Sequence, residues 1–72
     1  MERFLRYSLE KQRPIRLIFL TEEGGMKQVN AQIVGVDGEQ VKFTCLRPKG
    51  EFVVNKERIL SADYKRGDEG QE

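Results

Sequence analysis

Six polar side chains in the second half of the chain are of types that could bind a charged ligand. They are Lys42, Arg47, Lys49, Asn55, Lys56 and Arg58. Lys42 has the outward phase of a predicted strand, and Arg47 and Lys49 flank the turn that follows it. A basic turn of this kind can contact phosphates without reading bases. Ordinary solvated surface charge is the competing interpretation, because only Phe52 and Tyr64 could stack on bases.

Catalytic chemistry has few candidate residues in this sequence. The chain has no histidine and one cysteine, whereas a serine or cysteine nucleophile usually needs a histidine base. Cys45 has the inward phase of a strand and is expected to be a small core residue. Glu22 and Glu23 are neighbours in a predicted turn, where carboxylates are usually just solvated, and no phosphate-binding glycine motif occurs. We therefore expect neither enzymatic activity nor a bound cofactor.

Length and composition set further limits. Seventy-two residues are enough for one domain, and 13 basic residues nearly balance 12 acidic ones. One cysteine without histidine cannot supply the several ligands of a zinc site, so no metal is expected. A core this small is marginal, which favours self-association. The sequence has neither a membrane-length apolar run nor a signal-peptide pattern, and a lone thiol favours a reducing compartment, so we expect a cytoplasmic protein.

An amphipathic helix is predicted over residues 2–12. Phe4, Leu5 and Leu9 fall on one side of it and form an apolar stripe. Pro14 ends the helix, because the residue before a proline is disfavoured in the helical conformation. We expect the helix to close one end of a barrel, with a partner-docking face as the alternative.

Five short β-strands follow with almost no spare linker. They are predicted at residues 15–20, 27–36, 40–46, 51–54 and 59–64. In the second strand the apolar phase shifts to Val34 and Val36, on either side of Gly35, which is typical of a β-bulge or a sharp bend. Asp37-Gly38 is a strong two-residue turn signal.

The predicted fold class is mainly β: an N-terminal helix followed by a five-stranded, strongly bent antiparallel small barrel. Five strands in so short a chain must curl to bury their apolar face. The domain is expected to cover residues 1–64, with the barrel at 15–64. Residues 65–72 are glycine-rich and charged, and they are expected to form a disordered tail.

Two late strands have apolar residues on both alternating phases. These segments are Phe52-Val53-Val54 and Ile59-Leu60. An exposed edge strand would not tolerate that pattern, so we expect these strands to pair between copies in a homo-oligomer. Burial of one of them under the N-terminal helix is the alternative.

The order of elements resembles the Sm-like, SH3-type small barrel, and two families of that kind are similar in residues as well. The first is the short, free-standing kind of WYL-like protein, which PIRLIFLTEEGG, VKFTCLRPKGEF and RILSA resemble over about residues 11–62. This resemblance implies a regulatory module that binds a nucleotide or a nucleic acid.

The second resemblance, a weaker one, is to the bacterial RNA chaperone Hfq. A helix ending in a proline, IFL, QIVGVDG and NKERILS follow the layout of that family. Lys56-Glu57 stands where Hfq has a lysine-histidine pair near its central pore. The resemblance implies a ring that binds RNA, with Asn55 and Lys56 near the pore.

The leading hypothesis is therefore a non-enzymatic regulatory binding module. We expect it to hold a nucleotide or nucleic-acid ligand, such as RNA or an oligonucleotide, through Lys42, Arg47 and Lys49. A ring-forming RNA-binding protein of the Hfq kind is one alternative. A structural protein-interaction domain with no nucleic-acid role is another.

Overall fold

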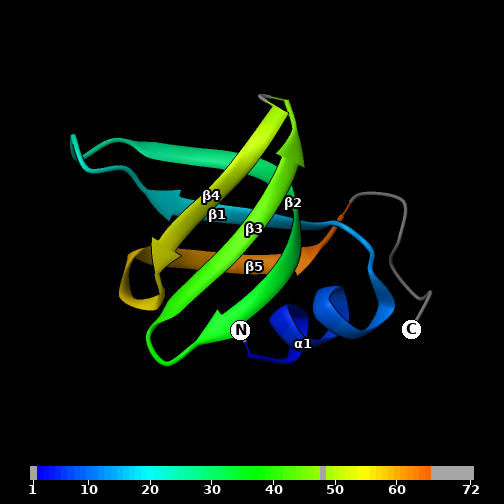
Figure 1. Cartoon of the computed structure of the whole chain (residues 1–72). Coiled ribbons are helices and arrows are strands. Elements are labelled where there is room, and N and C mark those ends of the chain that lie inside the picture. The colour runs from blue at the N-terminus through cyan, green and yellow to red at the C-terminus, as the bar shows by residue number, and fades with distance from the viewer. Residues whose placement is uncertain (1, 48, 66–72) are drawn as a thin grey trace.

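The described residues form one short α-helix, one 3₁₀ turn and a five-stranded antiparallel sheet (Figure 1). This computed structural model describes residues 2–47 and 49–65, so most of the predicted tail and Pro48 of the predicted basic turn lie outside the described residues. The elements in chain order are α1 (Glu2–Lys11), β1 (Ile15–Leu20), β2 (Met26–Asp37), β3 (Gln40–Leu46), β4 (Lys49–Asn55), the 3₁₀ turn η1 (Lys56–Arg58) and β5 (Ile59–Tyr64). The predicted class, mainly β behind an N-terminal helix, is confirmed.

The sheet is strongly bent, and β2 carries the bend. The strand order is β4-β3-β2-β1-β5. β2 pairs with β1 from Met26 to Ala31 and with β3 from Ala31 to Asp37, so only Ala31 has a strand partner on both sides. In Figure 1, β2 curves from the β1–β5 half to the β3–β4 half, which crosses in front. In the described residues no ladder joins β4 to β5, so the curled sheet keeps two open edges.

The predicted β-bulge lies where the sequence placed it. The β2–β3 register shifts between Ile33 and Gly35, which leaves Val34 as the extra residue. Val34 and Val36 are both more than a third exposed and do not join the core. Gly35 has no positive φ, and a Cβ added there would meet no atom within 4 Å. The bend therefore does not depend on the special freedom of a glycine.

The core lies between the two halves of the bent sheet and under the helix. Val29, Ala31 and Ile33 face inward from β2, and Val41, Phe43 and Cys45 face inward from β3, as the alternation predicts. The other buried apolar residues are Leu5, Tyr7, Ile15, Leu17, Val54 and Ile59. β1 is less enclosed than predicted, because its residues from Ile18 onward are only half-buried.

The helix presents a different face from the predicted one. Leu5 is buried, but Leu9 is 39% exposed, and Tyr7 and Ser8 turn inward instead. The Tyr7 ring packs edge-on against the Tyr64 ring at 5.1 Å, at the end of β5. This contact and the bonds of Ser8 decide the rotation of the helix more than the leucine stripe does.

The fully buried Ser8 hydroxyl fastens the helix to the bend. Its Oγ accepts a hydrogen bond from the backbone N–H of Ile33 at 2.8 Å and donates one to the carbonyl oxygen of Arg13 at 2.6 Å. Ile33 lies beyond Ala31, where β1 no longer pairs with β2. The serine therefore supplies a partner where the neighbouring strand is missing.

Tight turns join the strands on either side of the bend. Asp37 pairs with Gln40, so the turn residues are Gly38 and Glu39, one position later than predicted. Gly38 has φ +58°, which a residue with a Cβ adopts only with strain.

Replacing Ser8 with alanine should leave the buried backbone N–H of Ile33 without a hydrogen-bond acceptor. We expect the free energy of unfolding to fall by about 1–3 kcal/mol, the penalty for a buried donor without a partner. Urea denaturation measures it. Ser61→Ala, at an exposed site on β5, is the control and should change stability by less than about 0.5 kcal/mol. Equal midpoints for the two variants would contradict the role of Ser8.

The two glycines near the second hairpin should respond oppositely to alanine. Gly38→Ala forces a side chain into a left-handed conformation and should lower the free energy of unfolding by about 1–2 kcal/mol. Gly35→Ala enters open space at an ordinary φ and should be neutral or raise stability by up to about 1 kcal/mol. Thermal melts of both variants test this, and a strongly destabilised Gly35→Ala would overturn the account of the bulge.

Candidate functional site

Two of the six predicted site residues meet in a groove beside the β3–β4 turn. Arg47 lies in that turn, and Lys49 begins β4 opposite Leu46; both cations are exposed. Lys65, just after β5, lines the same groove. We call this space of about 720 Å³ the basic groove.

The basic groove has a polar wall as well as its three cations. Asn30 and Gln32 of β2 and Thr44 of β3 line it, and Gln32 lies directly opposite Thr44. Its described lining contains neither an aspartate nor a glutamate. No described residue forms an ion pair with Arg47, Lys49 or Lys65. The groove therefore has a concentration of positive charge that the described part of the protein does not neutralise.

Lys42 shares a face with the basic groove but lies outside its lining. It is two residues from Thr44 along β3 and lies on the same face of the sheet. It pairs with Val53 of β4. Glu51 of β4 pairs with Thr44, so a carboxylate lies on the same face of the sheet beside the groove. Of Lys42, Arg47 and Lys49, which were predicted to bind one ligand, only Arg47 and Lys49 line the basic groove.

Asn55 and Lys56 make contacts that hold the β4–β5 connection. The Asn55 side-chain oxygen accepts a hydrogen bond from the backbone N–H of Glu57 at 3.2 Å and caps η1. The Lys56 ammonium forms an ion pair with Glu2 of α1 at 3.0 Å, and the backbone N–H of Lys56 donates a hydrogen bond to the carbonyl oxygen of Glu39. Both side chains that were predicted to lie near a pore have partners within the domain.

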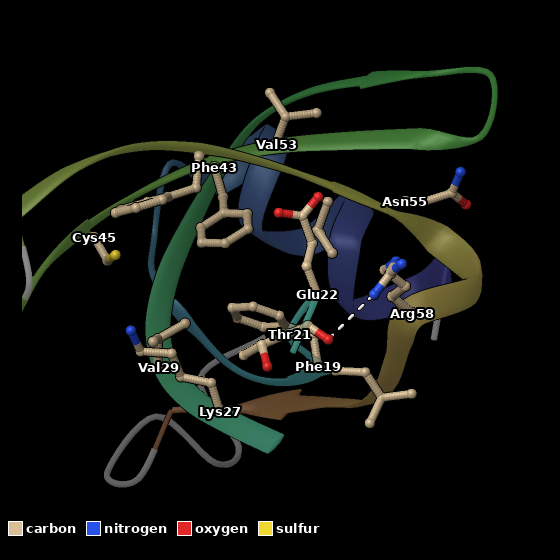
Figure 2. A pocket seen from close by; sticks show the side chains of 13 residues that line it. Phe19, Thr21, Glu22, Lys27, Val29, Phe43, Cys45, Val53, Asn55 and Arg58 are labelled. Carbon is tan, nitrogen blue, oxygen red and sulfur yellow. Dashed lines mark hydrogen bonds between the residues drawn. The ribbon is translucent and has the colours of Figure 1, made fainter. Parts of the chain in front are cut away.

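Arg58 lines a second groove, which Asn55 also borders. Its Nη1 donates a hydrogen bond to the carbonyl oxygen of Thr21 at 3.2 Å, drawn as the dashed line in Figure 2. Phe19, Phe43 and Phe52 form much of the wall of this space of about 430 Å³. We call it the aromatic groove. The predicted site residues are therefore divided between two surfaces.

The two candidate stacking residues also have different environments. Tyr64 is half-buried, with the rings of Phe4 and Tyr7 packed edge-on against it at 5.0 and 5.1 Å. Phe52 is 38% exposed and stacks on Phe43 at 5.8 Å. Of the two, only Phe52 lines a groove, and it is not the basic one.

Cys45 is buried, as its strand phase predicts. Within residues 2–47 and 49–65, no group of three histidine, cysteine or acidic side chains is placed to hold a metal ion. None of the helices in that part of the chain is long and apolar enough to cross a membrane.

Sequence reasoning assigned Lys65 to the tail and missed it as a site residue. No local signal marks it, because pairing of β5 with β1 brings it to the groove. No protein-family model matches this chain, and no curated protein or solved structure matches it either.

Proposed function

We propose that this chain is a non-catalytic regulatory module that binds single-stranded nucleic acid along the basic groove. One observation carries the proposal: Arg47, Lys49 and Lys65 converge on one groove whose described lining has no carboxylate. The resemblance to WYL-like proteins and to the Sm-like barrel supports the same ligand class.

The groove suits phosphates better than bases. A guanidinium group forms paired hydrogen bonds with phosphate oxygens, and lysines add compact positive charge. Asn30, Gln32 and Thr44 offer amide and hydroxyl donors to the same oxygens or to sugars. The described lining has no aromatic side chain, so bases have nothing to stack on there. Binding should therefore depend strongly on salt and weakly on sequence.

Removing two of the cations should weaken nucleic-acid binding and make the affinity less dependent on salt concentration. In the double variant Arg47→Ala/Lys49→Ala, the salt slope for a fluorescent single-stranded oligonucleotide should fall by about 1.4 units. Each single-strand phosphate contact contributes about 0.7 units. Fluorescence anisotropy between low and physiological salt measures both the slope and the affinity.

A double variant with the same charge change is the control. Arg6→Ala/Lys11→Ala removes two exposed cations of α1 that line neither groove, and it should bind like the unmodified protein. Equal losses in both double variants would show that net charge alone matters and would contradict the groove. If the unmodified protein fails to bind at low salt, only the protein-interaction alternative survives.

The open sheet edges support self-association as a second proposal. β4 pairs only with β3, and β5 only with β1, among the described residues. Val53 on β4 is 55% exposed and Leu60 on β5 is 50% exposed. An unpaired edge with apolar side chains is a template for another strand. We propose that these edges pair between copies in a homo-oligomer.

Light scattering after gel filtration tests the assembly. We expect a mass of several protomers, reduced to the protomer mass by Val53→Lys and by Leu60→Lys, which place charges on the two edges. Lys42→Glu, on the same face as Val53 but within the central sheet, is a control and should keep the assembly. A monomer at high protein concentration would overturn the proposal, and a hexamer-sized species would favour the Hfq-like alternative.

A further inference from the structure

The aromatic groove is a separate hollow inside the curl of the sheet. Phe19 comes from β1, Phe43 from β3 and Phe52 from β4. The Phe43 ring is stacked on Phe52 with an interplanar angle of 28°, and Phe19 is tilted against Phe43 at 5.8 Å. In Figure 2 the rings of Phe19 and Phe43 both point into the space. Three strands thus bring aromatic faces to one concave surface.

Part of this apolar surface is reachable from solvent, chiefly on Phe52 and on the half-buried Phe19. Phe52 keeps 38% of its surface exposed, although its neighbour Phe43 is almost completely buried. A volume of about 430 Å³ lies within the usual range for small-ligand pockets, and it suits a compound of one or two rings. Concave apolar surface with aromatic walls favours a planar ring, which stacks on a phenylalanine face.

The rim of the groove is charged, with an excess of positive side chains. Lys27 lies near the start of β2 and Arg58 in η1, and Figure 2 shows their charged groups on opposite sides of the groove. The side chain of Glu22, from the turn between β1 and β2, projects into the space. The bond from Arg58 to Thr21 fixes the guanidinium at the rim and leaves its other N–H donors for a ligand. In the described part of the chain, no carboxylate forms an ion pair with Lys27 or Arg58. A single negative charge on the ligand would complement the Arg58 side of this rim.

From this geometry we propose that the aromatic groove binds a small planar aromatic compound with one anionic group, such as a carboxylate. The ring lies against Phe52 and Phe19, and the anion faces Arg58. This site is distinct from the basic groove, and it takes a ligand of a different class from a nucleic-acid strand.

Two probes with the same ring and opposite charges test the ligand class. Indole-3-acetate is the anionic probe and tryptamine the cationic one, and each is titrated into the ¹⁵N-labelled protein by NMR. We expect indole-3-acetate to bind at least about tenfold more tightly than tryptamine, which corresponds to a difference in binding free energy of about 1.4 kcal/mol. Its shifts should centre on the amides of Phe43, Phe52 and Arg58.

Variants separate the role of the charge from that of the rings. Arg58→Gln should lose most of the preference for the anion, whereas Lys11→Gln, with the same charge change on exposed α1, should keep it. Phe52→Leu keeps an apolar side chain but removes the ring, and it should lower the affinity for both probes severalfold. The same NMR spectra show whether each variant is folded.

Three outcomes would overturn the proposal. They are equal affinities for the two probes, no binding of indole-3-acetate at millimolar concentration, and shifts centred on Arg47 and Lys49 instead. An anion preference that survives in Arg58→Gln but disappears in Lys11→Gln would place the site elsewhere and would equally overturn it.

Discussion

The shape of this protein depends on one buried hydrogen-bonding group, the N–H of Ile33. β2 is longer than either neighbour and leaves β1 at Ala31, so its backbone beyond that point loses a partner on one side. A buried amide left without an acceptor would make the bend unfavourable. Ser8 provides that acceptor from the helix, and its hydroxyl donates a hydrogen bond to the carbonyl oxygen of Arg13. One hydroxyl group therefore connects the rotation of the helix, the position of the bulge and the angle between the two halves of the sheet.

The bent sheet places the two grooves on its opposite faces, and alternate residues of the same strands line one or the other. On β3, the inward positions give Phe43 to the aromatic groove, and the outward positions give Thr44 to the basic groove. Cys45 borders both spaces although it is buried. Because the phase of a strand has a period of two, a one-residue change of register would exchange these surfaces. The bulge at Val34 lies beyond the part of β2 that lines the grooves, so it adjusts the curvature without disturbing either wall.

Much of the architecture could be read from the sequence, since alternation and turn residues are local signals. The strands at residues 15–20, 40–46 and 59–64 have the predicted bounds, and the bulge beside Gly35 was predicted from its phase shift. The helix face was not predictable, because apolarity favoured Leu9 over Ser8, and the need of Ile33 for an acceptor arises only in the folded sheet. The division of the basic residues between two grooves and the arrival of Lys65 depend on pairings between distant strands. No local pattern contains that information.

The order of the strands also has a consequence for how the chain folds. β1 through β4 form a meander in which each strand pairs with the next along the chain, so these contacts close short loops. β5 instead pairs with β1, and Tyr64 comes to lie beside Ile15. Closing this longer loop requires more conformational entropy to be lost before any contact forms. The last strand should therefore join a preformed meander late in folding, and until it does, the free side of β1 would be exposed on the nascent or partly unfolded chain.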